Sequence, residues 1–341
     1  MKAVVIYKHG GIENLELANF NKPGCPDDKV LIKVKACSIN HLDIWVRNGI
    51  PGLNIPLPLI LGSDASGIIE QVGSKITSFN VGDSIVVQPG TFNINCKQSV
   101  LGKENYSKSY GILGETENGV QAEYIALDVN NIHLMPEHLT YEDAASMPLV
   151  FMTAYQMLIN RADLKPDENV LIYGATSGIG MAAIQIAKDL GATVISTVGN
   201  DSKKKFAESL GCDFVINHNT CNISKEVKKI NKNGVDVVFE HVGPDTWEHS
   251  LRCLAIGGRI VTCGATTGSQ VSFDLRYLFM KQQSILGSTM AGLATFKEVM
   301  DKINSNELTP FVDEIFKFSE VKLAHTKIEN RKQFGKIIIC P

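Results

Sequence analysis

The glycine-rich segment 174–180 is the clearest place for chemistry in this sequence. It reads Gly-Ala-Thr-Ser-Gly-Ile-Gly, directly follows the apolar run 169–173, and precedes a helical pattern over 181–190. Glycines at a strand-to-helix turn allow close backbone approach, and the helix start offers free N–H groups and a positive dipole end to a pyrophosphate. We expect a dinucleotide site here; a turn that only packs helix on sheet is the alternative. The expected contacts are Gly174, Thr176, Ser177, Gly178 and Ile179.

The residues after the second expected strand favour NADPH as the cofactor. A site that prefers NAD usually has Asp or Glu there, about 20 residues past the loop, to hold the ribose 2′-hydroxyl. Here the strand ends in Thr197, Val198 and Gly199, and three lysines, beginning with Lys203, follow at 203–205. Hydroxyl, amide and cationic groups would meet a 2′-phosphate. Lysines that only solvate a helix, with Asp201 turned to the ribose, are the alternative.

Two kinds of element must position these motifs. Six strand patterns alternate with helices and predict a doubly wound parallel sheet: 169–173, 193–198, 214–216, 235–240, 259–263 and 284–287. Earlier β patterns, cut by Gly and Pro, predict a mainly β half: 30–34, 66–72, 84–87 and 123–126. We expect the β patterns near 312–316 and 336–339 to rejoin that half. The predicted fold class is α/β, with domains 1–146 (joined by 305–341) and 147–304.

Composition limits the classes of function. The 341 residues carry 33 Lys plus Arg against 36 Asp plus Glu, a formal net charge of −3, and 44% are hydrophobic. This argues against disorder and gives no net attraction to nucleic acid or anionic membranes. The eight cysteines form no C-x-x-C pair, and no apolar run approaches the roughly 18 residues of a membrane helix. We expect a cytoplasmic protein that acts on a small molecule, without membrane or nucleic-acid partners.

The whole chain resembles the medium-chain dehydrogenase/reductase superfamily, which includes zinc alcohol dehydrogenases and quinone oxidoreductases. The segments that carry the resemblance are 40–47, 61–64, 72–73, 81–83, 153–155, the glycine-rich segment and 285–288. The resemblance implies a GroES-like β domain followed by a Rossmann nucleotide-binding domain. It also implies that substrate and nicotinamide meet in the cleft between the two domains.

The zinc ligands of the family are missing from the matching positions. The three catalytic-zinc positions correspond to Asn40, Ser63 and Leu149, none of which is a good ligand. In the structural-zinc lobe only Cys96 remains of four cysteines, and one thiolate cannot close a tetrahedral site. We therefore expect no metal. An improvised metal site is the alternative, and it would use the nearby side chains of His41, Asp43 and Asp64.

Without zinc, the pattern favours reduction of an activated double bond or a quinone. Zinc stabilises the charge that builds on one oxygen of a simple ketone, whereas a delocalised enolate can be held by hydrogen-bond donors. Asn40 and Ser63 are such donors, and Asp43 is placed to organise them or relay a proton. The alternative is structural: Asn40 and Asp43 can cap a helix, and Ser63 can shape a turn.

Two further groups of residues are expected at the nicotinamide end of the cofactor. The ends of the fourth and fifth parallel strands give the first group, and the resemblance gives the second. They are His241, Gly264 and Ala265, and Thr153, Asn217 and Arg331, respectively. Arg331 lies in a charged segment, so a surface role is its alternative.

The leading hypothesis is a zinc-independent, NADPH-dependent reductase of a quinone, an enone or an enoyl-CoA such as acryloyl-CoA. An alcohol or aldehyde dehydrogenase with a non-standard metal site is the first alternative, and a non-enzymatic NADPH-bound structural or RNA-binding protein is the second. The expected sixth strand, 284–287, would leave an unpaired sheet edge. Pairing of that edge with a second copy predicts a homodimer or homotetramer.

Overall fold

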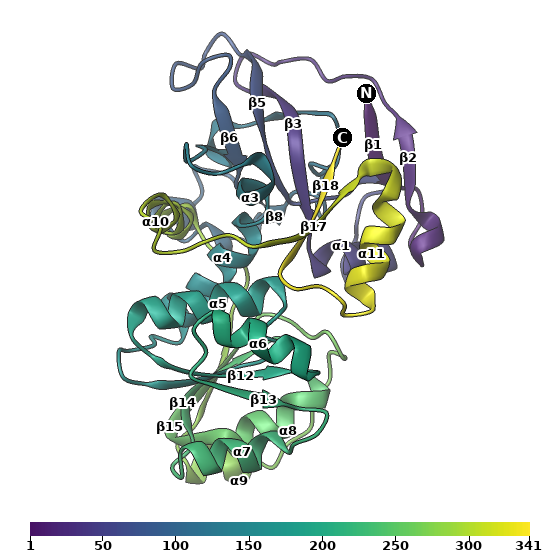
Figure 1. Cartoon of the computed structure of the whole chain (residues 1–341). Helices are drawn as coiled ribbons and strands as arrows, with labels where there is room; N and C mark the ends of the chain where they lie inside the picture. Colours follow the sequence, from purple (N-terminus) through teal and green to yellow (C-terminus); the bar gives the residue numbers. More distant parts are fainter. The chain divides into compact units, whose positions relative to one another are not determined.

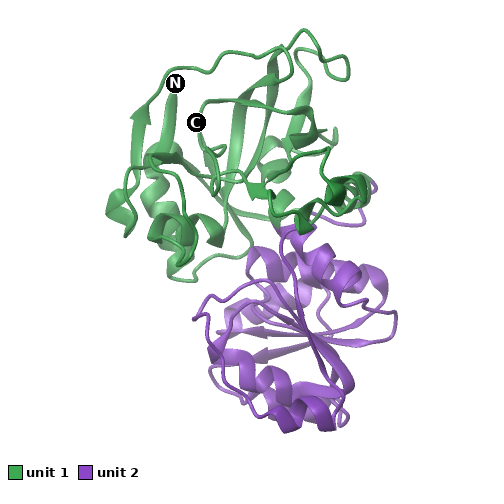
Figure 2. Ribbon diagram, turned by 180° about the vertical axis from the view of Figure 1, so that it is seen from behind, with its two compact units in different colours: residues 1–149, 291–304, 310–341 green, residues 150–290, 305–309 purple.

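The computed structural model describes residues 1–341 and divides them into two compact units. Unit 1 comprises Met1–Leu149, Ala291–Asn304 and Pro310–Pro341, and unit 2 comprises Val150–Met290 and Ser305–Thr309 (Figure 2). The first boundary lies three residues beyond the predicted one. Helix α10 (Leu293–Asn304) is a correction to the predicted domains, because it belongs to unit 1 and not to unit 2.

Local contacts explain why α10 joins unit 1. The buried carboxylate of Glu104 accepts the N–H of Leu293 at the start of the helix, at 3.3 Å. Tyr110 Oη donates to the carbonyl of Ala291 at 3.1 Å. The segment 305–309 that follows α10 belongs to unit 2. There the side chain of Gln185 donates from Nε2 to the carbonyl of Thr309 and accepts the N–H of Thr309 at Oε1.

Unit 1 is built on a seven-stranded sheet in the order β10-β6-β5-β3-β18-β17, with β9 also paired to β3 (Figure 1). Its strands are β3 (Val30–Ile39), β5 (Asp64–Val72), β6 (Ser84–Val87), β9 (Tyr124–Leu127), β10 (Ile132–Leu134), β17 (Val312–Lys317) and β18 (Lys336–Cys340). Strand β18 runs antiparallel to β3 and parallel to β17. The predicted return of the chain end to the first domain is therefore seen.

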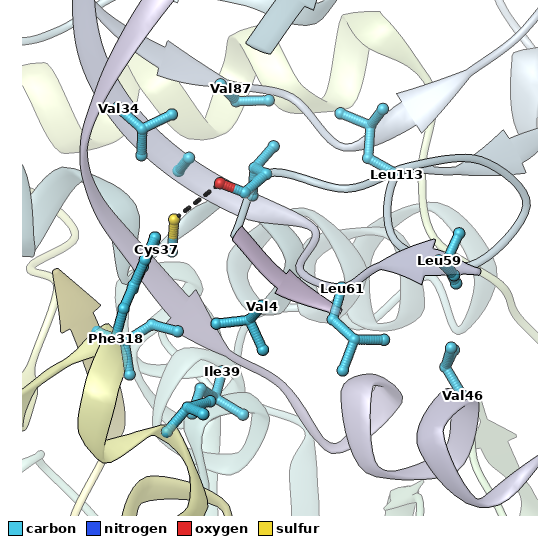
Figure 3. Packing of buried hydrophobic residues seen from close by; sticks show 14 of the residues in the cluster. Val4, Val34, Cys37, Ile39, Val46, Leu59, Leu61, Val87, Leu113 and Phe318 are labelled. Atoms are coloured by element: carbon cyan, nitrogen blue, oxygen red, sulfur yellow. Dashed lines mark hydrogen bonds between the residues drawn. The ribbon is translucent and has the colours of Figure 1, made fainter. Parts of the chain in front are cut away.

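Smaller elements complete unit 1. Two small sheets contain β1 (Lys2–Ile6), β2 (Glu16–Asn19) and β4 (Leu59–Ile60), and β7 (Gly90–Thr91) and β8 (Gly111–Ile112). The helices are α1 (His41–Asn48), α2 (Lys97–Val100), α3 (Tyr141–Ala145) and α11 (Val321–Glu329), with 3-10 turns at Ile12–Asn14, Glu104–Tyr106, Val129–Asn131 and Phe318–Glu320. Apolar side chains from the strands and helices of unit 1 form one core. Within this core, Cys37 Sγ donates to the carbonyl of Val120 at 3.1 Å (Figure 3).

Unit 2 is a six-stranded parallel sheet in the order β13-β12-β11-β14-β15-β16, which is the doubly wound order. Its strands are β11 (Asn169–Ile172), β12 (Thr193–Val198), β13 (Phe214–Asn217), β14 (Val235–Glu240), β15 (Leu254–Thr262) and β16 (Ser284–Gly287). The predicted Rossmann sheet is confirmed. Strand β15 begins five residues earlier than predicted, before a break in its register with β14.

Helices cover both faces of this sheet. Figure 1 shows α5 and α6 on one side of the strands and α7, α8 and α9 on the other. The helices are α4 (Pro148–Tyr155, which starts in unit 1), its continuation Gln156–Arg161, α5 (Gly178–Leu190), α6 (Asp201–Ser209), α7 (Ile223–Ile230), α8 (Pro244–Cys253) and α9 (Leu275–Met280). Strand order reverses between β11 and β14, so their carboxyl ends form the crevice where ligands bind in such sheets. No helix anywhere in the chain has the length and apolarity to span a bilayer.

Candidate functional site

A buried polar cluster lies at the start of α1 in unit 1. Asn40 follows the last residue of β3 with extended backbone angles and precedes the helix. The carboxylate of Asp43 accepts the N–H of Asn40 at 2.7 Å and the N–H of Gly62 at 3.0 Å. Asp43 thus satisfies a free N–H at the helix start. The structure shows the capping contact that was the alternative interpretation of this pair.

The side chain of Asn40 makes different contacts. Its Nδ2 donates to Asp64 Oδ2 at 2.8 Å, and its Oδ1 accepts a hydrogen bond from Lys336 Nζ. Asp64 also accepts from Ser38 Oγ at 3.0 Å and, through its other oxygen, from the N–H of Leu149 at 2.9 Å. Lys336 Nζ is 3.4 Å from Asp64 Oδ2. The carboxamide therefore lies between a buried anion and a buried cation.

Burial changes the proton affinity of this cluster. Burial raises the pKa of Asp43 to about 7, against the opposing effects of the Asn40 and Gly62 N–H groups and the charge of Lys336. Burial lowers the pKa of Lys336, while the carboxylates of Asp64 and Asp43 oppose that shift. A carboxyl group with a pKa near neutrality is suited to exchange a proton with a substrate.

Ser63 is buried, and its hydroxyl donates to the carbonyl of Leu113 at 2.8 Å. The one hydroxyl hydrogen is therefore used, and the oxygen retains only acceptor capacity. This corrects the expectation of a ready donor at Ser63, because the bond to Leu113 would have to break first. The contact supports the turn after β4, which was the alternative interpretation, and a catalytic role stays a prediction.

The cluster does not fit a zinc ion. The positions that match the family's ligands hold an amide, a hydroxyl that is already bonded and the aliphatic Leu149. Throughout the chain, no group of three or more His, Cys, Asp or Glu side chains is arranged to bind a metal. The carboxylate of Asp64 already faces the ammonium of Lys336, which would repel a cation.

Hydrogen bonds hold the lobe where the family has structural zinc. Cys96 Sγ lies 3.2 Å from Ser99 Oγ and 3.5 Å from Ser107 Oγ, and it accepts the N–H of Ser99. These hydrogen bonds lower the pKa of Cys96 to about 7. Ser99 Oγ in turn donates to the carbonyl of Asn93 at 2.8 Å. Hydroxyl groups thus occupy two of the positions where further thiolates would be needed.

In unit 2, the glycine-rich loop lies at the carboxyl end of β11. Gly174 has φ +67°, which favours glycine, and a Cβ on Gly180 would lie 2.2 Å from the carbonyl oxygen of Gly174. Ser177 Oγ accepts the N–H of Gly180 at 3.0 Å and donates to the Gly174 carbonyl at 2.8 Å. Thr197 Oγ1 accepts the N–H of Gly174 at 3.0 Å. The geometry is that of a phosphate-binding turn.

The carboxyl end of β14 meets this loop. His241 Nε2 lies 2.9 Å from the carbonyl of Tyr173, and Thr266 Oγ1 donates to the carbonyl of His241. The buried carboxylate of Glu240 accepts the N–H groups of Val242 and Gly243, at 2.6 and 3.1 Å. Glu240 was not among the predicted residues, although a carboxylate that ends an apolar strand was a visible signal.

The remaining predicted cofactor residues have varied surroundings. Asn217 Nδ2 donates to Asp201 at 3.0 Å, so this contact engages the carboxylate that was the alternative ribose ligand. Asn200 Oδ1 accepts the N–H of Lys203 at the start of α6. Thr153 is buried and donates to the sulfur of Met290. The others are Thr176, which is buried, Gly178 and Ile179 at the start of α5, Gly199 after β12, Gly264 and Ala265 after β15, and Arg331, exposed in unit 1.

Comparisons with known proteins cover both units. Residues 26–137 match the model of an alcohol dehydrogenase GroES-like domain, and residues 178–305 match that of a zinc-binding dehydrogenase. The chain is 32% identical to a crotonyl-CoA carboxylase/reductase from Cereibacter sphaeroides, covering 97% of this chain and 85% of that protein. It is 30% identical to quinone oxidoreductase from Homo sapiens, covering 85% and 80%.

Solved structures superpose on this chain over nearly its whole length. The structure of an NAD-dependent alcohol dehydrogenase superposes with a TM-score of 0.96 at 36% identity and covers 100% of both chains. A 2-octenoyl-CoA carboxylase reductase, solved in complex with NADP and 2-octenoyl-CoA, gives 0.89 at 29% identity and covers 96% of this chain and 82% of that one. The relatives thus include proteins named for both kinds of cofactor and for more than one reaction.

Proposed function

The chain belongs to the medium-chain dehydrogenase/reductase superfamily of oxidoreductases, and from that premise we propose that it reduces an activated carbon–carbon double bond or a quinone with NADPH and without zinc. The proposed alkene substrates are enones and enoyl-CoA thioesters such as acryloyl-CoA. One observation carries the proposal: Asn40, at one of the three positions of the family's catalytic-zinc ligands, belongs to a buried network with the carboxylate of Asp64 and the ammonium group of Lys336.

The chemistry of that network suits a delocalised anion. Bound NADPH supplies a hydride, which would add to the carbon β to a carbonyl and leave negative charge on the carbonyl oxygen. Asn40 Nδ2 has two hydrogens and gives one to Asp64, so the second is available to that oxygen. The carboxyl group of Asp43, with a pKa near 7, would supply the proton that completes the reduction.

The residues of unit 2 fit the cofactor. The turn at Gly174 and the N–H groups that begin α5 would hold the pyrophosphate. Val198 ends β12 without a carboxylate, and the lysines at 203–205 stand at the start of α6, where cations would meet a 2′-phosphate. The proposal of NADPH draws further support from the relative solved with NADP.

An alcohol or aldehyde dehydrogenase is the second candidate, and the likeness to an NAD-dependent alcohol dehydrogenase favours it. A non-enzymatic, nucleotide-bound role is the third. The decisive experiment measures oxidation of NADPH and NADH with quinones, enones and short enoyl-CoA esters, and reduction of NAD and NADP with simple alcohols. Turnover of an activated alkene or quinone that survives a chelator is the expected result, and turnover of alcohols alone would refute the proposal.

We also propose that the chain forms a homodimer or homotetramer through the edge of its parallel sheet. Strand β16 is the last strand in the sheet order, and its Ile285 is exposed. Apolar side chains on α9, which precedes β16 along the chain, are exposed as well: Leu275, Phe279 and Met280. Pairing of β16 with a second copy would satisfy the edge and cover this apolar surface.

A further inference from the structure

Lys336 was not predicted as a functional residue, yet it is the one cation in contact with Asn40 and Asp64. We propose that Lys336 is a positioning residue, which together with Asp64 fixes the carboxamide of Asn40 in one orientation. This inference rests on the proposed function, in which the free hydrogen of Asn40 Nδ2 binds the substrate oxygen. Lys336 itself would not touch the substrate.

The orientation follows from the two charged partners. The ammonium of Lys336 donates to Asn40 Oδ1, and the carboxylate of Asp64 accepts from Asn40 Nδ2 at 2.8 Å. If the carboxamide turned over, its NH2 group would face an ammonium that can only donate, and its oxygen would face a carboxylate that can only accept. Both contacts would change from attraction to repulsion. One orientation is therefore enforced from both sides.

Three adjacent strands hold the parts in place. Asn40 directly follows β3, Asp64 begins β5, and Lys336 begins β18, and β3 pairs with both of the other strands. Ile337 pairs with Ile39, which brings Lys336 next to Asn40. Lys336 is only 3% exposed, and its N–H donates to the carbonyl of Phe311 at 3.1 Å. A site carried on paired strands keeps its geometry better than one carried on loops.

The first test separates orientation from stability. Lys336→Met alone leaves Asp64 as an unpaired buried charge, which is strongly destabilising. The double variant Lys336→Met/Asp64→Asn removes both charges and should melt at a higher temperature than Lys336→Met. Its kcat should stay at least about tenfold below that of the wild type, because the substrate-facing N–H is no longer fixed, while its KM for NADPH should be unchanged.

Lys327→Met is the matched control. Lys327, in α11, is a partly buried lysine that pairs with two carboxylates, Asp313 and Glu314, both at 2.6 Å, and it makes no contact with the cluster. The Lys327→Met variant should be less stable than the wild type and should have the same kcat. A double variant at Lys336 and Asp64 that folds and turns over like the wild type would overturn the inference.

The second test needs no substrate, so it distinguishes failure of this inference from failure of the proposed function. In wild-type protein labelled with 15N-asparagine, one carboxamide hydrogen of Asn40, the one bound to Asp64, should exchange slowly with solvent. In Lys336→Met, or in Lys336→Leu if the first does not fold, its exchange should accelerate at least about tenfold, because the amide can turn. A wild-type protein without a slow hydrogen, or a variant that keeps it, contradicts the clamp even if no acceptor is ever found.

Discussion

Lys336 and Asp64 form a buried ion pair, 3.4 Å between Nζ and Oδ2, and Asn40 is hydrogen-bonded to both partners. A buried pair of this kind gains little net stability over a packed apolar pair, since both charges lose their hydration. We therefore expect the main role of this ion pair to be the orientation of Asn40.

Replacement of Asn40 tests the catalytic interpretation against the capping one. Asn40→Ala removes the amide that would hold the enolate oxygen, so kcat should fall about a hundredfold. Loss of a helix cap alone would cost about 1 kcal/mol of unfolding free energy. Asn222→Ala is the control, because Asn222 caps α7 through its bond to the N–H of Lys225. Equal kcat values in both variants would show that the side chain of Asn40 has only a structural role.

The raised pKa of Asp43 predicts two effects of pH. Its pKa is about 7 in the fold, well above the ordinary aspartate pKa of 3.8. Between these values the folded state binds more protons than the unfolded state, so the contribution of Asp43 to stability is present at low pH and is lost as pH rises through 7. If Asp43 donates the proton, kcat should also decline above pH 7.

Asp43→Asn is the variant that checks both effects. Urea unfolding at pH 5 and pH 8 should show a smaller loss of stability across that interval in the variant than in the wild type. The alkaline decline of kcat should disappear along with most of the activity. An unchanged alkaline limb in the variant would assign the titration to another group.

The preference for NADPH is expected to depend on Lys203. Lys203→Glu should weaken NADPH binding at least about tenfold while changing NADH binding little, because one charge-assisted contact to the 2′-phosphate is lost. Lys225→Glu, an exposed lysine on α7, makes the same charge change elsewhere. Fluorescence titration gives both dissociation constants. Equal ratios of the two constants in the wild type and in Lys203→Glu would exclude this lysine.

The sheet edge predicts an oligomer. Light scattering at micromolar concentration should give a mass of two or four chains, and Ile285→Lys should shift it towards one. Phe214→Lys is the control, since Phe214 is comparably exposed on β13, the opposite edge of the sheet. A wild-type mass of one chain, or equal effects of the two variants, would contradict assembly through β16.

The sequence predicted the parallel sheet well because its strands are local apolar runs. Strands β12, β14 and β16 begin and end where predicted, and the glycine-rich loop stands before α5. The helix begins at Gly178, three residues earlier than expected, because Ser177 caps it through the N–H of Gly180. Capping of this kind extends a helix beyond the span of its apolar pattern.

The part that the sequence did not predict depends on long-range pairing. Lys336 looked like the polar start of a strand, and only the register of β18 on β3 brings it to Asn40, 296 residues away. Ser63 looked like a free donor, but its partner is the carbonyl of Leu113 in a distant turn. Local patterns carry no information on either contact. The same holds for α10, whose apolar face does not reveal which unit it covers.

Zinc independence of an NADPH-dependent reduction is the central claim, and one measurement tests it most directly. Purified protein, dialysed and analysed for metals, is assayed for NADPH oxidation with an enoyl-CoA ester and a quinone, with and without a chelator. We predict less than stoichiometric zinc, turnover of at least one of these acceptors, and no effect of the chelator. Oxidation of a simple alcohol that a chelator abolishes and zinc restores would contradict the account.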